Sequence, residues 1–146
     1  MHSRKAAWVQ GAALAAVIVA IASAVVFRFN RPLDRDALAI QVAQLQSNAA
    51  EAQWLVDNAH ADRLAPGVVR QHAQQMAAMV ETSSDTLKKL AQPELKAQKM
   101  QAQRLGASLH RGLVLLGRGG AAHAELGFDA TADALGALHE QLKTAD

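Results

Sequence analysis

The chain has 146 residues and is rich in two strong helix formers, with 33 alanines and 13 glutamines. It has no cysteine, which excludes disulfides, thiolate metal ligands and covalently attached haem. The net charge of +2 is small, and no basic arm is interleaved with aromatic residues, so the composition does not indicate nucleic-acid binding. An all-α domain is therefore expected after the N-terminal segment.

Residues 1–5 form a basic tail, and residues 6–27 form an apolar run whose only polar side chains are Gln10 and Ser23. A helix of this length rises about 33 Å, enough to cross a hydrocarbon core of roughly 30 Å. Trp8 lies near one end of the run and Phe27 at the other, where interfacial aromatic residues are common. The run predicts a single transmembrane helix, a signal anchor, followed by a juxtamembrane linker at residues 28–33.

The alternative for this segment is a cleaved signal peptide, because Ala22-Ser23-Ala24 matches the small-residue pattern of a cleavage site. We favour retention, since the apolar run continues past Ala24 to Phe27. A basic tail followed at once by a span favours a cytoplasmic N-terminus and an extracytoplasmic C-terminal domain. The expected location is the inner membrane of a bacterial envelope, with the domain in the periplasm. Cleavage at Ala24 would instead release the same domain as a secreted periplasmic protein.

Residues 34–146 contain four series of mostly apolar or small residues spaced three and four apart, which puts each series on one face of a helix. Asp34 or Asp36 is expected to cap the first helix and Asp129 the last. Turns are expected near residues 62–67, 91–94 and 117–120, and such short connections make successive helices antiparallel. The sequence therefore predicts an antiparallel up-down-up-down four-helix bundle. The four series are Leu38, Val42, Leu45, Ala49, Ala52, Val56, Ala59; Val69, Ala73, Met76, Val80, Ser83, Leu87, Leu90; Leu95, Gln98, Ala102, Leu105, Leu109, Gly112, Leu116; and Phe128, Thr131, Leu135, Leu138, Leu142.

Small residues recur in these series, as at Ala49, Ala52, Ala73, Ala102 and Gly112. Burial of each small residue contributes less to folding stability than burial of a large apolar side chain would, by on the order of 1.5–3 kcal/mol. The expected core is thin and only modestly stable alone, and association with a second chain, another protein or a further copy, would recover part of the deficit.

Two surface features indicate partner binding. Trp54 falls opposite the first apolar series, where a solvent-facing residue is expected, and an outward tryptophan often marks a contact surface. The alternative is that Trp54 covers the edge of the bundle. The residues Arg104, Arg111 and Arg118 are seven apart, so they form one stripe along a helix. The stripe is expected to face lipid phosphates, an acidic partner or only solvent.

His72, Met76 and Met79 are four and three apart on one helix, and imidazole and thioether ligands suit copper or a non-covalent haem. His60 and His110 are candidates to approach this cluster. The alternative is that the methionines fill an irregular core and His72 flanks it.

Two catalytic or cofactor signals are rejected. Gly117, Gly119 and Ala122 match a dinucleotide-binding spacing, but no strand precedes them, and the glycines suit the end of a helix. Ser47, Ser83, Ser84 and Ser108 have no evident His and Asp partners, so the chain is not expected to be an enzyme.

The expected function is that of a non-catalytic membrane-anchored helical bundle that binds another protein, with a copper- or haem-binding bundle as the alternative. A span that leads into a four-helix bundle resembles the sensor regions of bacterial chemoreceptors and sensor kinases in architecture. That resemblance implies a sensor-like or accessory subunit.

Overall fold

The computed structural model describes residues 32–119 and 126–144. These residues form four α-helices and no β-strand, which confirms the predicted all-α fold. The helices are α2 (Arg35–His60), α3 (Pro66–Leu87), α4 (Lys96–Gly117) and α5 (Phe128–Thr144), and a short 3-10 turn, η1 (Pro93–Leu95), precedes α4. The breaks between helices fall where the turns are predicted.

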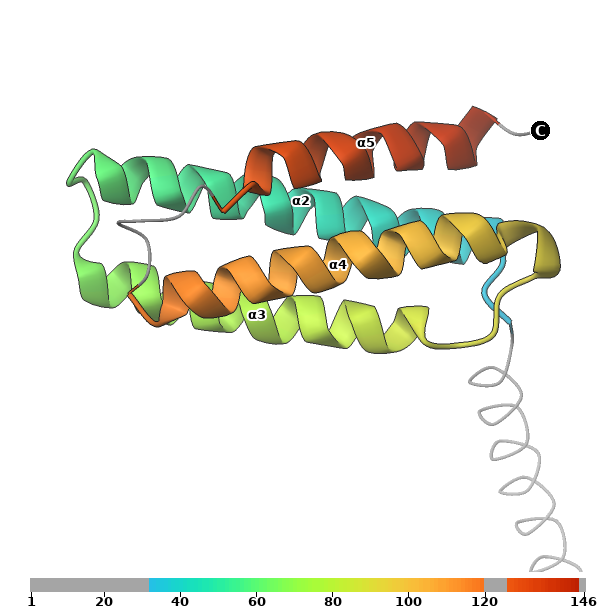
Figure 1. Cartoon of the computed structure of the whole chain (residues 1–146), viewed down its shortest axis with the longest axis horizontal. Coiled ribbons are helices and arrows are strands. Elements are labelled where there is room, and N and C mark those ends of the chain that lie inside the picture. Colours follow the sequence, from blue (N-terminus) through green and yellow to red (C-terminus); the bar gives the residue numbers. More distant parts are fainter. Residues whose placement is uncertain (1–31, 120–125, 145–146) are drawn as a thin grey trace, which may run out of the picture. The chain divides into compact units, whose positions relative to one another are not determined.

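Consecutive helices run in opposite directions, so the four helices form an up-down-up-down bundle (Figure 1). α2 packs most extensively along α5, and α3 along α4. The starts of α2 and α4 and the ends of α3 and α5 therefore lie at one end of the bundle (Figure 1). We call this the entry end and define it as residues 33–36, 85–99 and 140–144; the opposite end, residues 60–68 and 117–119, is the far end.

Local signals in the sequence determine where the helices begin. Asp34 caps α2, because its Oδ1 accepts a hydrogen bond from the amide of Ala37 at 2.9 Å. Pro66 is the first residue of α3. An amide at this position would have no acceptor within the helix, so the absence of the amide hydrogen in proline costs no hydrogen bond. The predicted cap at Asp129 is wrong, because α5 begins one residue earlier at Phe128. Asp129 lies in the first turn, where its negative charge favours the helix N-terminus.

Two glycines lie at the end of α4, as predicted for a helix terminus. Gly117 is the last helical residue, and Gly119 has a φ of +87°, a conformation that favours glycine. Arg118, between them, donates its amide to the carbonyls of Val114 at 3.2 Å and Leu115 at 3.1 Å. Gly117 therefore belongs to a helix and does not follow a strand, as a dinucleotide-binding motif would require.

The buried faces of the helices follow the predicted series closely, and the small residues Ala49, Ala52, Ala73 and Ala102 are fully buried in the core as predicted. Gly112 leaves no deficit, because a Cβ there would lie 2.6 Å from Cε1 of Phe128, whose ring is buried. A small residue on α4 thus makes room for a large one on α5. Leucines from all four helices are less than 2% exposed: Leu38, Leu45, Leu55, Leu87, Leu109, Leu113, Leu116, Leu135 and Leu138.

Leu90 is the main exception to the predicted series, because it lies beyond the end of α3 and is 82% exposed. Its backbone is held by the residue that leads into α2. The carbonyl of Leu90 accepts a hydrogen bond from the amide of Leu33 at 2.7 Å, and the amide of Gln92 donates to the carbonyl of Leu33 at 3.2 Å. The start of the bundle is therefore attached to the α3–α4 connection.

The predicted transmembrane helix at residues 6–27 lies outside the described residues. Within residues 32–119 and 126–144, every helix is too short or too polar to span a membrane.

Candidate protein-interaction face

Two rows of residues, spaced three and four apart, line the outer side of the junction between α2 and α3. Because the spacing keeps each row on one side of its helix, the rows form one continuous surface, which we call the α2–α3 face. Its members are Ile40, Gln44, Ser47, Glu51, Trp54 and Asn58 on α2, and Val68, His72, Gln75, Met79, Thr82 and Thr86 on α3.

The α2–α3 face carries much of the large apolar surface that the bundle exposes. Ile40 is 57% exposed, Trp54 54%, Val68 51% and Met79 54%. The described part of α5 has no comparably exposed large hydrophobic residue, and α4 has Met100 and Leu115, on the other side of α3. Apolar side chains at helical spacing along two adjacent helices are what a docking helix contacts.

Trp54 lies where the sequence predicts, on the side of α2 that faces away from the core. Its backbone carbonyl accepts a hydrogen bond from the side-chain amide of Asn58 at 2.8 Å, which keeps Asn58 close to the helix. The indole itself is more than half exposed.

A shallow hollow of about 390 Å³ lies on the α2–α3 face between Trp54 and the entry end of the bundle. Most of its lining residues are polar, and Met79 supplies its one large apolar side chain. The lining residues are Gln44, Ser47, Asn48, Glu51, Met79, Thr82 and Ser83.

A side-chain hydrogen bond crosses the α2–α3 face beside the hollow. Nε2 of His72 lies 2.7 Å from Oε1 of Glu51, and the two side chains are 37% and 44% exposed. Such partly exposed pairs contribute at most about 1 kcal/mol. The pair nevertheless fixes the position of His72 relative to α2.

The three predicted metal ligands lie in different surroundings. Met76 is 1% exposed and belongs to the core, whereas Met79 is 54% exposed and His72 pairs with Glu51. His60 and His110 line two other hollows of the bundle, so the structure does not bring them to this cluster. In the part of the chain that the structure describes, no three His, Cys, Asp or Glu side chains are grouped as metal ligands.

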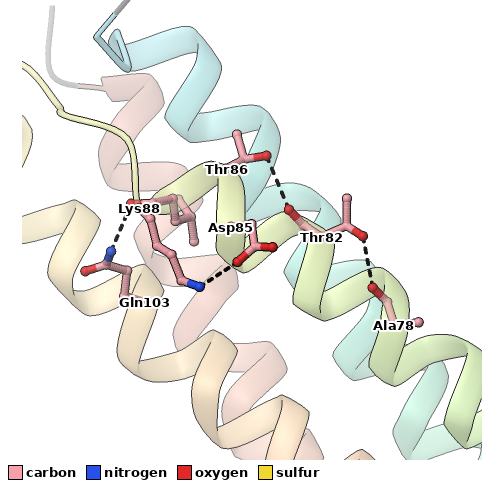
Figure 2. Close-up of polar contacts among 7 residues, drawn as sticks. Ala78, Thr82, Asp85, Thr86, Lys88 and Gln103 are labelled. Atoms are coloured by element: carbon pink, nitrogen blue, oxygen red, sulfur yellow. Dashed lines mark hydrogen bonds and ion pairs between the residues drawn. The ribbon is translucent and has the colours of Figure 1, made fainter. Parts of the chain in front are cut away.

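The two threonine hydroxyls of the face are bonded within α3. Oγ1 of Thr82 donates to the carbonyl of Ala78 at 3.0 Å, and Oγ1 of Thr86 donates to the carbonyl of Thr82 at 3.3 Å (Figure 2). Both hydroxyls thus use their hydrogen on the helix backbone and present methyl groups and oxygen lone pairs outward.

Arg104 and Arg111 on α4, and Arg118 directly after its end, are exposed, as their spacing predicts. None of them makes an ion pair with another residue of the ranges 32–119 and 126–144. Arg111 lines a hollow of about 450 Å³ together with the acidic residues Glu81 and Asp85 of α3. The arginine stripe therefore lies apart from the α2–α3 face, and it leaves its charges available to solvent or to a partner.

Ser84 and His110 line that same hollow between α3 and α4. Oγ of Ser84 is buried and has no hydrogen-bond partner among the described residues, so it is not paired with His110. A serine nucleophile is normally activated by a base within about 2.6–3.2 Å. The hollow does not have that arrangement.

Sequence reasoning identified Trp54 but not the rest of the apolar surface. Ile40 precedes Trp54 by two heptads, which was the available signal on α2. Val68 and Met79 could be assigned to the same surface only once α3 was known to lie beside α2 in this register.

Comparison of the chain with protein-family models, curated proteins and solved structures found no match.

Proposed function

We propose that this chain is a non-catalytic, membrane-anchored helical bundle that binds another protein through the α2–α3 face. The observation that carries the proposal is the cluster of half-exposed Ile40, Trp54, Val68 and Met79 on two adjacent helices. Exposed apolar side chains that recur along two adjacent helices are typical of interaction sites, and tryptophan is enriched among the residues that dominate binding energy.

The side chains of the α2–α3 face indicate the chemistry of the partner. Its only acidic member, Glu51, already pairs with His72, so the exposed apolar side chains are what the face offers to a partner. A helix that carries an apolar stripe would match them. The proposed partner is therefore an amphipathic helix of a second protein.

The apolar run at residues 6–27 supports the membrane part of the proposal, since it is long and apolar enough to be a span. The proposed topology has the N-terminus in the cytoplasm and the bundle in the periplasm. Protection of the C-terminus from protease in intact cells, and its cleavage after the outer layer is permeabilised, would support this topology. A mature protein that starts at Val25 would instead show a cleaved, secreted form.

The binding proposal is tested by photocrosslinking of the full chain in its own cells. A photoreactive amino acid is introduced at position 54 and, as the matched control, at position 115 on α4, since Leu115 is also about half exposed. The expected result is one dominant adduct from position 54, identified by mass spectrometry and reproduced with the purified pair.

A dominant adduct from position 115 and none from position 54 would overturn the assignment of the face. An adduct of twice the mass of the chain would instead identify the partner as a second copy. The arginine stripe on α4 is a second candidate for contact, and crosslinking from position 115 would support it.

A further inference from the structure

The entry end of the bundle is rich in lysine. Five of the six lysines of the chain lie there, on the α3–α4 connection, the first turn of α4 and the end of α5. They are Lys88, Lys89, Lys96, Lys99 and Lys143. Long lysine side chains of this kind reach lipid phosphates while their backbone stays outside the bilayer.

Leu90 lies among these lysines and is the most exposed large hydrophobic residue that the structure describes, at 82%. Its neighbours Leu33 and Leu95 are buried, at 4% and 2% exposed. The two backbone hydrogen bonds of Leu33, to Leu90 and from Gln92, hold this connection against the start of α2. Leu90 is therefore presented outward by an ordered backbone.

Two side chains from α4 fix the same connection. Nε2 of Gln103 donates to the carbonyl of Leu87 at 2.9 Å (Figure 2), and Nζ of Lys99 donates to the carbonyl of Lys89 at 2.7 Å. Both bonds use carbonyls that the end of α3 leaves without helical partners. The connection is thus held from α2 and from α4.

Carboxylates at the entry end offset much of the positive charge. Oδ1 of Asp85 lies 2.6 Å from Nζ of Lys88, and Oε1 of Glu140 lies 3.4 Å from Nζ of Lys143, so two of the lysines are paired locally. The hydrogen bond to Asp85 and the charge of Asp85 raise the pKa of Lys88, so Lys88 stays protonated. Within residues 89–99, three lysines accompany one carboxylate, Glu94. The whole entry end has six basic residues, the five lysines and Arg35, and five carboxylates, Asp34, Asp36, Asp85, Glu94 and Glu140.

The length of chain before the bundle limits how far the entry end can lie from a membrane. Five residues, 28–32, separate Phe27, the last residue of the apolar run, from Leu33. Fully extended, the six steps from Phe27 to Leu33 span at most about 22 Å. Because the headgroup layer itself extends roughly 5–8 Å beyond the hydrocarbon core, the lysines of the α3–α4 connection are within reach of it.

We propose that the entry end docks on a membrane surface of anionic lipids, with Leu90 inserted between headgroups and the surrounding lysines on their phosphates. This inference rests on the membrane anchoring proposed above, and it adds a second membrane contact to the anchor. An exposed leucine flanked by basic residues is the combination that binds interfaces, where apolar burial and attraction to anionic lipid add together.

The test uses single-cysteine variants of the full chain, which has no cysteine of its own. Leu90→Cys carries an environment-sensitive fluorophore, and Val68→Cys is the matched control, because Val68 is 51% exposed at the far end. Each variant is reconstituted into vesicles of phosphatidylcholine alone or mixed with phosphatidylglycerol. The probe at position 90 is expected to shift to the blue, and to be quenched by lipid-bound quenchers, when phosphatidylglycerol is present. The probe at position 68 is expected to stay aqueous.

The variant Lys96→Gln measures the charge contribution. Each basic residue near an anionic surface strengthens binding about fivefold, so the ratio of docked to undocked bundle is expected to fall about fivefold. Flotation with neutral vesicles separates the two proposals. A chain that floats but keeps position 90 aqueous on anionic vesicles overturns docking and leaves the anchor intact. A chain that does not float overturns both.

Discussion

Replacing Trp54 with alanine is expected to weaken partner binding and leave the folded chain almost unchanged. Trp54 is 54% exposed, so of the roughly 250 Å² that a large aromatic side chain can bury, about 130 Å² remains for a partner to cover. At about 25 cal/mol per Å², this area corresponds to roughly 3 kcal/mol. Ordering the side chain costs about 0.5–1.5 kcal/mol of this gain, which leaves an expected loss of about 1–3 kcal/mol. The affinity should therefore fall roughly 5- to 150-fold.

The assay measures affinity and stability on the same pair of variants. Binding of the identified partner to full-length Trp54→Ala is compared with binding to Leu115→Ala, which removes a similarly exposed side chain from α4. Urea unfolding should show a stability change within about 0.5 kcal/mol for Trp54→Ala, as is usual for surface positions. The reasoning is refuted if Trp54→Ala lowers the stability by more than about 2 kcal/mol while binding stays the same, because the indole would then be structural.

Three further substitutions test the fold and the surface pair, each by urea unfolding. Gly112→Ala should destabilise by about 1–2 kcal/mol, because crowding against Phe128 costs about 1–3 kcal/mol and the better helix propensity of alanine returns at most about 1 kcal/mol. No loss would mean that the ring can move aside. Asp34→Ala should cost about 1 kcal/mol through the lost cap of α2. His72→Gln should cost less than about 1 kcal/mol, since its pair with Glu51 is partly exposed; a larger loss would give the pair a structural role.

The sequence allowed the helices and their buried faces to be predicted because both depend on local spacing. A residue such as Val42 or Leu135 is buried because it shares a helix face with apolar neighbours three and four positions away. Asp34 was recognisable for the same reason, since an N-cap bonds an amide only three residues ahead. Neither prediction requires knowledge of which helices are neighbours.

Features that depend on contacts between distant segments could not be predicted in this way. The position of Gly112 in its series indicated a gap, and only the packing of α5 on α4 shows that Phe128 fills it. Leu90 continued the spacing of α3, but the helix ends at Leu87, and the bond from Leu33 holds the connection in another direction. The α2–α3 face also depends on contacts between distant segments, since its two rows form one surface only because α2 and α3 lie side by side.

The division of large side chains between core and surface bears on the kind of partnership that the surface supports. Leucines of all four helices are buried within a single chain, and Phe128 occupies the space beside Gly112. Trp54 and Ile40 are each about half exposed and lie outside that core. A partner on the α2–α3 face would therefore cover side chains that the bundle does not itself bury, which is why the loss of Trp54 is expected to change the affinity more than the stability.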